Sequence, residues 1–214
     1  MAQYRLFGRP GWGSTIVEAQ LAALDVPFEY QEVPDLFSSE QARHDLARYN
    51  PLSQVPTLQL PDGSTLTESA AITLHLADAS GRDDFVPPPA NASRPQFLRW
   101  LVFLVANVYP TFTYADDPRR FVRDEAAAKA FDAVVDEYRC HLWRIVEAAA
   151  SAPWFLGARF SALDIYAATM THWGPGRRWF EDQAPSLAAI ARRTGEDARF
   201  RAVWQHNFPG DFGR

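Results

Sequence analysis

The stretch VPTLQLPDGSTLTESAAITLHLAD (Val55–Asp78) decides the fold of the N-terminal part of the chain. Two short strand-like segments, Thr57–Leu60 and Ser64–Leu66, flank the tripeptide Pro-Asp-Gly. Proline presets φ for a turn and glycine accepts a positive φ, so this tripeptide predicts a tight connection between two antiparallel strands. A helix is expected directly afterwards, over Ser69–Asp78. The stretch is therefore predicted to be a β-hairpin followed by a helix.

A strand–helix–strand unit is predicted upstream of this hairpin. Tyr4–Gly8 has the pattern of a short strand, and Phe28–Val33 alternates as a second one. The helix between them is expected to be capped by Ser14 and to run to about Leu24. Such a crossover is right-handed and joins two parallel strands. With another helix over Ser39–Tyr49, the order βαβαββα predicts an α/β domain with a four-stranded mixed sheet covered by helices.

The composition changes at Ser80–Ser93, where glycine, charged residues and three consecutive prolines exclude a continuous helix. We expect a domain boundary here, with a first domain over residues 1–80, a linker over 81–93 and an all-α domain over 94–214. Apolar residues recur at helical spacing in this last region, which predicts a bundle of long amphipathic helices.

The helical half contains one strong helix-start signal. In FSALDIYAA (Phe160–Ala168), Ser161 stands at the expected N-cap and Asp164 follows three residues later. This spacing predicts a capping box, in which the acidic side chain reaches back to the N-cap backbone. The signal indicates a folding device and carries no chemistry by itself.

The bulk composition limits the function classes. A chain of 214 residues with 47% hydrophobic residues can bury a sizeable core, and its net charge of −5 without a Lys/Arg run argues against nucleic-acid or anionic-membrane binding. The single cysteine, Cys140, excludes an internal disulfide, and no Cys/His spacing indicates a metal site. Because the sequence has neither a signal-peptide pattern nor a membrane-length apolar run, we expect a soluble cytoplasmic protein.

Two stretches of the first domain are expected to open at the same end of the sheet. One is the loop FGRPGWGST (Phe7–Thr15), and the other is the start of the helix at Ser69. Helix N-termini expose unpaired N–H groups, which suit carboxylates and thiolates. Glu68 and Ser69 suit a ligand with both an ammonium and a carboxylate group, although such a pair also serves as an ordinary cap. Val55 precedes Pro56 and is biased to extended backbone, which leaves its N–H and C=O available to a peptide-like ligand.

Taken in order, these features resemble the cytosolic glutathione transferase superfamily. The resemblance rests on the βαβαββα order, NPLSQVPTL (Asn50–Leu58), TES (Thr67–Ser69), the proline-bearing linker and the helical half with FSALDIY, and it covers nearly the whole chain. PGWGST, NVYPTFTYADDP and THWGPGRRWF are similar to an uncharacterised bacterial branch. The resemblance implies a thioredoxin-like domain followed by an all-α domain, glutathione as co-substrate without a metal, and a homodimer.

The same resemblance implies which residues bind glutathione. Carried over by position, Val55 would pair with the cysteinyl backbone of glutathione beside a cis bond to Pro56. Glu68 and Ser69 would hold the γ-glutamyl end, and Gln54 would contact the glycyl end.

The opening loop departs from the family pattern, in which a Tyr, Ser or Cys activates the thiol. Aligned on QLAALDVPFE (Gln20–Glu29), these three positions fall on Phe7, Gly11 and Gly13, and none of these has a side-chain hydrogen-bond donor. Two alternatives stay open: the hydroxyl of Ser14, or the backbone N–H groups of Gly13 and Ser14 acting with the helix dipole. Otherwise Ser14 would only cap the first helix.

An acceptor pocket is expected between the two domains, where ligand sites often form. Its candidate walls come from the opening loop and from ANVYPTFTY, namely Trp12, Asn107, Tyr109, Phe112 and Tyr114. Pro110 is expected to break or kink this helix. An aromatic stripe also fits ordinary core packing, so both interpretations stay open.

These features lead to three candidate functions. The first is transfer of the glutathione thiolate to a small hydrophobic electrophile, with no nucleic acid or membrane as partner. The second is glutathione-dependent reduction of disulfides or hydroperoxides, which the missing Tyr, Ser and Cys favour. The third is a non-catalytic module that binds glutathione or a partner, motivated by Phe7, Gly11 and Gly13.

Overall fold

The computed structural model describes residues 3–210, which divide into two compact units. The first unit contains the residues up to 85 together with those from 195 onward, and the second contains residues 86–194. The sequence pattern predicts a helical domain that spans residues 94–214. The segment after residue 194 instead groups with the N-terminal part of the chain.

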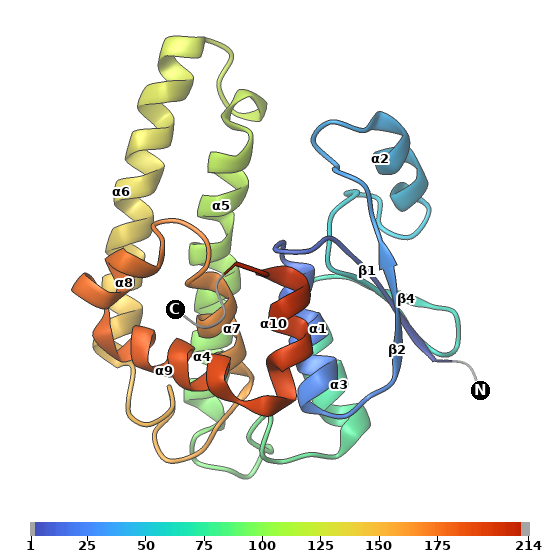
Figure 1. Cartoon of the computed structure of the whole chain (residues 1–214), viewed down its shortest axis with the longest axis vertical. Helices are drawn as coiled ribbons and strands as arrows, with labels where there is room; N and C mark the ends of the chain where they lie inside the picture. The colour runs from blue at the N-terminus through green and yellow to red at the C-terminus, as the bar shows by residue number, and fades with distance from the viewer. Residues whose placement is uncertain (1–2, 211–214) are drawn as a thin grey trace. The chain divides into compact units, whose positions relative to one another are not determined.

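A four-stranded sheet forms the centre of the first unit. Its strands are β1 (Tyr4–Gly8), β2 (Phe28–Glu32), β3 (Thr57–Gln59) and β4 (Thr65–Leu66), in the order β2-β1-β3-β4. β1 and β2 are parallel, whereas β3 is antiparallel to both β1 and β4. The helices that alternate with these strands are α1 (Ser14–Ala23), α2 (Glu40–Ala47) and α3 (Ser69–Ser80). The predicted βαβαββα order and mixed sheet are confirmed (Figure 1).

Helix α1 is buried on nearly all sides. Its apolar residues Ile16, Val17 and Leu21 have no exposed surface. Gln20 is also buried, and its Nε2 donates to Thr73 Oγ1 of α3 at 2.8 Å. This hydrogen bond satisfies polar groups where two helices pack. α1 and α3 lie side by side in Figure 1.

The β3–β4 hairpin has the predicted turn. The N–H of Leu60 donates to the C=O of Ser64 at 2.8 Å, and the N–H of Gly63 donates to the C=O of Leu60 at 2.9 Å. Gly63 has a φ of +87°, a conformation that glycine adopts without steric cost. Asp62 Oδ1 accepts from both the N–H and the hydroxyl of Ser64. The Pro-Asp-Gly prediction is confirmed.

Helix α10 (Arg201–Asn207) belongs to the first unit and packs on α1. It follows a short 3-10 turn, η3 (Ala198–Phe200), which also contacts α1. Phe200 and Trp204 are buried. Their side chains complete the core around α1, and this burial is the physical reason why the segment leaves the helical unit.

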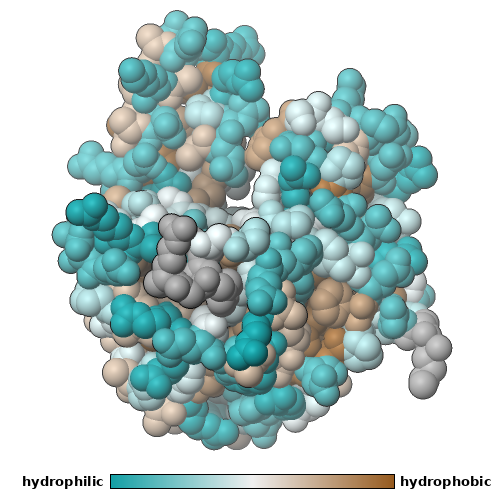
Figure 2. Space-filling view, in the orientation of Figure 1, coloured by the Kyte–Doolittle hydropathy of each residue, from teal (hydrophilic) through white to brown (hydrophobic). Residues whose placement is uncertain are grey.

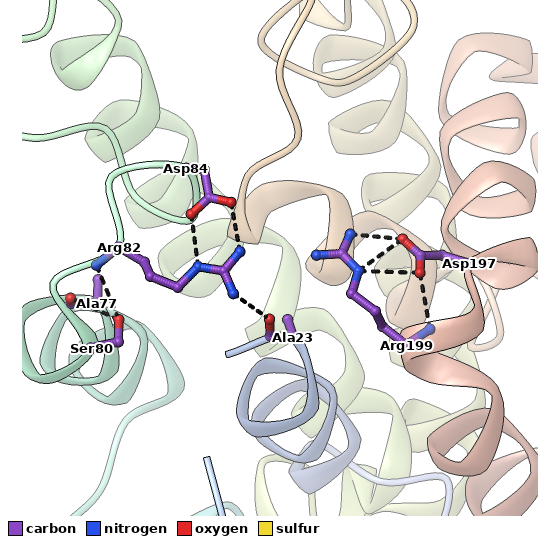
Figure 3. A network of polar contacts seen from close by, with 7 residues as sticks. All are labelled: Ala23, Ala77, Ser80, Arg82, Asp84, Asp197 and Arg199. Carbon is purple, nitrogen blue, oxygen red and sulfur yellow. Dashed lines mark hydrogen bonds and ion pairs between the residues drawn. The ribbon is translucent and has the colours of Figure 1, made fainter. Parts of the chain in front are cut away.

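Two arginine–aspartate pairs lie close to the points where the chain leaves the first unit and returns to it (Figure 3). Arg82 donates to both oxygens of Asp84, at 2.9 and 2.6 Å, and to the C=O of Ala23 at 3.1 Å. Asp197 binds Arg199 in the same two-pronged way, with a shortest distance of 2.7 Å. The Arg82 hydrogen bonds hold the pKa of Asp84 below its ordinary value, and the charge of Arg199 adds to this.

The second unit is all-helical, as predicted. Its elements are α4 (Arg94–Phe103), a π-helical turn η1 (Leu104–Val108), α5 (Tyr109–Asp116), a 3-10 turn η2 (Pro118–Arg120), α6 (Glu125–Ala149), α7 (Ala162–Met170), α8 (Arg177–Gln183) and most of α9 (Pro185–Glu196). α6 is amphipathic, since Trp143 and Val146 are buried whereas Val134 and Tyr138 are exposed. Within residues 3–210, no helix has the length and apolar character needed to cross a membrane.

The irregularity expected at Pro110 takes the form of a π-helical turn. α4 passes through η1 directly into α5, and the N–H of Tyr109 donates to the C=O of Leu104. Pro110 has no N–H to donate to the preceding turn, and the adjoining π-helical turn accommodates the missing hydrogen bond. The chain therefore stays helical, and the disturbance is confined to η1.

α7 begins with the predicted capping box. Asp164 Oδ2 accepts from the N–H of Ser161 at 2.7 Å, and Oδ1 accepts from the N–H of Phe155 at 2.7 Å. Asp164 has no exposed surface. Burial raises the pKa of Asp164 to about 6, although its hydrogen bonds act in the opposite direction.

Candidate functional site

The loop between β1 and α1 is closed by Ser14. Its Oγ donates to the C=O of Arg9 at 3.0 Å and accepts from the N–H of Arg9 at 2.9 Å. Ser14 is fully buried, and the N-cap of α1 is Gly13. The expectation that Ser14 caps the first helix is therefore wrong, because its hydroxyl ties the loop back to Arg9.

Closely packed atoms surround the Ser14 hydroxyl. A Cβ on Gly8 would lie 2.8 Å from Ser14 Oγ and 2.8 Å from the Tyr30 hydroxyl oxygen. Glycine at position 8 is therefore required for β1 to pass beside these two groups. Burial raises the pKa of Tyr30, so its hydroxyl stays protonated at neutral pH. Two neutral hydroxyl groups thus lie behind the loop, inside the first unit.

None of the three positions expected to activate a thiol offers a side-chain donor. Phe7 is buried and packs on Tyr49 with ring centroids 4.5 Å apart. Gly11 has a φ of +77°, a backbone conformation that residues other than glycine rarely adopt. Gly13 and Ser14 begin the ten-residue helix α1, and their N–H groups have no acceptor among residues 3–210. These N–H groups are unpaired donors at a helix N-terminus.

The Val55 segment has an open backbone edge. The bond from Val55 to Pro56 is cis, as the family resemblance implied. Asn50 Nδ2 donates to the C=O of Gln54 at 3.0 Å and to Thr57 Oγ1 at 3.1 Å. Thr57 Oγ1 in turn donates to the C=O of Gln54 at 2.7 Å. The N–H and C=O of Val55 have no partner in the described part of the chain, so buried neighbours fix a backbone segment that is itself free to pair.

Glu68 and Ser69 stand at the N-terminus of α3, as predicted. Glu68 is exposed and occupies the N-cap with a φ of +63°, which is uncommon for a residue other than glycine. Such conformations concentrate at functional sites. Ser69 is 8% exposed. A carboxylate and a hydroxyl therefore lie beside the positive end of a twelve-residue helix.

One hydrophobic cluster links the opening loop to the Val55 segment. It consists of Phe7, Val33, Leu36, Ala42 and Leu46, with Trp12, Tyr49 and Val55 packed against it. Trp12 also contacts Phe37, with ring centroids 5.0 Å apart, and the Arg9 guanidinium lies 5.5 Å from its ring. The structure thus brings two predicted site residues, Trp12 and Val55, onto the same cluster.

Tyr109 and Phe112 of the predicted acceptor pocket belong together. Both rings meet Trp173 edge to face, at centroid distances of 5.7 Å for Tyr109 and 5.1 Å for Phe112. Asn107 lies on η1 and its Nδ2 donates to the C=O of Phe103 at 3.3 Å. The aromatic pair and Trp173 therefore form a local group within the second unit.

Tyr114 lies apart from this group, in an open hollow of about 490 Å³ on α5, α6 and the chain between them. The hollow is lined by Tyr114, Phe121, Phe131, Val134, Val135 and Tyr138. Phe121 is 46% exposed and Val134 is 63% exposed. Figure 2 shows hydrophobic side chains among hydrophilic ones over α5 and α6. The hollow is thus an exposed apolar surface.

Sequence reasoning missed a buried arginine in the second unit. Arg139 is 5% exposed, pairs with Asp136, and lies over the Phe112 ring at 5.0 Å. Burial lowers the pKa of Arg139, and burial raises the pKa of nearby Asp116. Arg139 occupies the buried face of α6, where helical periodicity favours an apolar residue, so the sequence pattern does not distinguish it.

Sequence reasoning also missed a contact between α10 and the opening loop. Asn207 Oδ1 accepts from the N–H of Gly11 at 3.0 Å and from Thr15 Oγ1 at 2.7 Å. Nearly the whole chain separates these residues, and no local motif connects them. Only the folded chain reveals that α10 contacts the loop of the candidate site.

Comparisons with known proteins decide the family. A sequence model of the glutathione S-transferase N-terminal domain matches residues 14–79. The uncharacterized GST-like protein YncG of Escherichia coli K12 is 40% identical over 204 residues, which cover 95% of this chain and 98% of the relative. The chain belongs to the glutathione S-transferase family. The resemblance inferred from the ordered motifs is confirmed.

Solved structures of glutathione S-transferases share this fold. A glutathione transferase homolog from Sulfitobacter with bound glutathione has a TM-score of 0.83 and 22% identity, over 95% of this chain and 97% of its own. A sphingomonad glutathione S-transferase complexed with glutathione has a TM-score of 0.74 and 26% identity, over 94% and 97% of the two chains. The predicted fold, a thioredoxin-like domain with an all-α domain, is confirmed.

Proposed function

We propose that this protein binds glutathione and transfers its thiolate to a small hydrophobic electrophile. The observation that carries the proposal is the backbone of Val55 next to Pro56, which has no hydrogen-bond partner within residues 3–210, in a chain of the glutathione S-transferase family. Extended backbone of this kind recognises a peptide laid alongside it. Glutathione is a tripeptide with a backbone to pair, a thiol to activate and charged ends to hold.

Three groups in the first unit are assigned to the two ends and the middle of glutathione. The Val55 N–H and C=O pair with the cysteinyl residue. The Ser69 hydroxyl, at the N-terminus of α3, donates to the γ-glutamyl carboxylate, and Glu68 accepts from the γ-glutamyl ammonium. The exposed Gln54 contacts the glycyl end.

Backbone N–H groups are the proposed activators of the thiol. The Ser14 hydroxyl is engaged by Arg9 as donor and as acceptor, whereas the N–H groups of Gly13 and Ser14 are unpaired within residues 3–210. Lowering the thiol pKa from about 8.5 to about 6.5 requires about 2.7 kcal/mol. Two charge-assisted hydrogen bonds supply energies of this order. The Ser14 hydroxyl is the alternative activator, and Ser14→Ala separates the two.

The transfer itself is a substitution or addition at the electrophile. The thiol proton passes to solvent and the thiolate sulfur forms a bond to the electrophilic carbon. In a substitution, the leaving group departs with the electron pair of the broken bond. In an addition, the π bond of the electrophile breaks, and its electron pair moves to the far atom, which takes a proton from solvent. Asn107, Tyr109 and Phe112 of the second unit are the proposed contacts of this acceptor, since aromatic side chains suit a small apolar molecule. We place the reaction in the cytoplasm, as detoxification.

We also propose a homodimer that covers the hollow around Tyr114. Large exposed apolar patches mark interaction surfaces, and Phe121, Val134 and Tyr138 are 46%, 63% and 50% exposed. A second copy of the chain is the proposed occupant. Light scattering coupled to size-exclusion chromatography measures the mass of the assembly.

Glutathione-dependent reduction is the second candidate function. It is favoured because Phe7, Gly11 and Gly13, the positions expected to activate the thiol, have no side-chain donor, and disulfide exchange requires only a thiolate. The glutathione thiolate attacks one disulfide sulfur and the other sulfur leaves as a thiolate. A second glutathione then attacks the mixed disulfide and releases oxidised glutathione.

Binding and turnover measurements on the same protein test these proposals. Titration calorimetry measures glutathione affinity, with Ser69→Ala as the site variant. Conjugation across a panel of electrophiles supports the transferase, whereas NADPH consumption with a disulfide substrate and glutathione reductase supports the reductase. Binding without either activity would leave a non-catalytic glutathione-binding module, and absence of binding overturns the proposal.

A further inference from the structure

We propose that Asn207 is a positioning residue, which clamps the opening loop so that the N–H groups of Gly13 and Ser14 are held in place for a thiolate. This inference rests on the proposed function, in which these two N–H groups stabilise the sulfur of glutathione. It assigns a role in the glutathione site to α10, an element that contains none of the predicted site residues.

The Asn207 side chain uses both halves of its amide. Oδ1 accepts from the N–H of Gly11 at 3.0 Å and from Thr15 Oγ1 at 2.7 Å. Nδ2 donates to Glu18 Oε2 at 2.9 Å and to the C=O of Val203 at 2.8 Å. Because the Gly11 N–H can only donate and the Val203 C=O can only accept, the partners fix which way the amide points.

The two contacts of Asn207 Oδ1 lie on either side of the N–H groups of Gly13 and Ser14 in the sequence. Gly11 precedes Gly13 and Ser14, and Thr15 follows them directly in the first turn of α1. One oxygen atom therefore holds the chain on both sides of the two unpaired donors. Releasing this oxygen frees the segment between the two contacts, while the rest of α1 stays packed.

The clamp is buried and supported from behind. Asn207 is 6% exposed, Glu18 is 7% exposed and Thr15 is fully buried. The other oxygen of this carboxylate, Glu18 Oε1, is hydrogen-bonded to His206 Nδ1 at 2.9 Å. The Glu18 carboxylate thus binds two consecutive residues at the end of α10. A buried polar group without a hydrogen-bond partner costs free energy, so these buried side chains are held in the hydrogen-bonded arrangement described.

Gly11 shows why the loop has no serine at the place where the family pattern expects one. Its φ of +77° turns its N–H toward Asn207. A Cβ at this position would be in ordinary van der Waals contact, 3.4 Å from the C=O of Asn207, so it is the positive φ that disfavours a side chain. The position is used to dock the loop onto α10, so it is not available for an activating side chain.

Asn207→Ala and Val203→Ala form a matched pair of variants. Both lie on α10 and both are buried, so both are expected to lower thermal stability. Only Asn207→Ala removes the loop contact. The pKa of the bound glutathione thiol, followed by the ultraviolet absorbance of the thiolate, is expected to rise by about one unit in Asn207→Ala, equivalent to a tenfold loss of thiolate below the pKa. It is expected to be unchanged in Val203→Ala.

A double variant tests the geometry of the clamp. Asn207→Asp keeps an oxygen for Gly11 and Thr15 but sets a carboxylate against Glu18, so it is expected to disrupt the site. Adding Glu18→Gln replaces that carboxylate by an amide that can donate, while the C=O of Val203 still faces a carboxylate oxygen. The double variant is therefore expected to recover part of the thiol pKa of the original protein. Failure of the double variant to improve on Asn207→Asp overturns the clamp.

Hydrogen exchange of the Gly11 amide separates this inference from the proposed function. In the ligand-free protein, Asn207→Ala is expected to accelerate this exchange about tenfold or more, because local opening controls exchange. If the original protein binds no glutathione, the proposed function fails, and the Gly11 exchange rate alone decides whether the clamp exists. Equal exchange rates, or equal thiol pKa shifts in Asn207→Ala and Val203→Ala, overturn the positioning role.

Discussion

Replacing Ser14 by alanine separates the two ways in which the opening loop can activate a thiol. If the hydroxyl donates to the sulfur, its removal abolishes activation. If the N–H groups of Gly13 and Ser14 act, the alanine variant keeps both of them. The structure favours the second outcome, because the hydroxyl is already engaged by Arg9, both as donor and as acceptor.

The size of the stability loss follows from the contacts of Arg9. In Ser14→Ala, the N–H of Arg9 loses its acceptor, whereas the C=O of Arg9 still accepts from the N–H of Trp12 at 3.1 Å. One buried donor is left unpaired, which costs about 1–3 kcal/mol. For a chain of this length, that corresponds to a fall in Tm of about 2–12 °C. The kcat/KM for glutathione is expected to change by less than about fivefold, well below the 100-fold or greater effect typical of losing a direct donor to a developing charge.

The assay pairs thermal unfolding with kcat/KM, measured as a function of pH. Ser39→Ala is the matched control, because the Ser39 hydroxyl accepts from the N–H of Ala42 at 3.1 Å and caps α2. Loss of a cap costs about 1 kcal/mol, so the control reports a comparable destabilisation outside the opening loop. A loss of two orders of magnitude or more in Ser14→Ala, with a Tm close to that of Ser39→Ala, refutes backbone activation and makes Ser14 the catalytic group.

Three further changes test other parts of the molecule. Ser69→Ala is expected to raise the Kd for glutathione by about 10- to 150-fold in titration calorimetry, because a hydrogen bond to a charged group contributes about 1.5–3 kcal/mol; an unchanged Kd contradicts its assignment. The pKa of Asp164 is raised from 3.8 to about 6 in the folded chain, so the folded state holds this proton more tightly than the unfolded state. Its contribution to stability is present below pH 4 and is lost as the pH rises through 6, by about 3 kcal/mol in total. Urea unfolding of Asp164→Asn is expected to lack this slope, and an identical slope in both proteins rules out the assignment. Val134→Asp places a charge in the hollow on α6 and is expected to halve the mass found by light scattering, whereas an unchanged mass excludes this face as the dimer contact.

The sequence predicted those features of the fold that depend on local patterns. The turn at Asp62–Gly63, the order of strands and helices, and the capping box of Asp164 all arise from residues close together in the chain. The start of α3 at Glu68 and Ser69 was also predicted from the residues themselves, whereas the cis bond at Pro56 was implied by the family resemblance. Each of these features has a recognisable signature of a few residues.

The role of Ser14 and the grouping of α10 were beyond sequence reasoning, for one shared reason. A hydroxyl near a helix start fits both a cap and a loop closure, and only the position of the Arg9 backbone decides between them. In the same way, Glu18 on α1 and Asn207 on α10 are 189 positions apart. A buried polar pair of this kind leaves the helical periodicity of each partner unchanged.

The return of α10 to the first unit has a consequence for how the protein is made. A growing chain leaves the ribosome from its N-terminus, and domains generally fold as units during synthesis. The helical unit consists of one continuous segment, residues 86–194, and is available for folding before α10 emerges. Synthesis of the first unit begins first but ends last, because the partners of Glu18, His206 and Asn207, are near the C-terminus of the chain. A product of premature termination that lacks α10 therefore contains every strand of the sheet, but it lacks the Asn207 contacts that hold the opening loop.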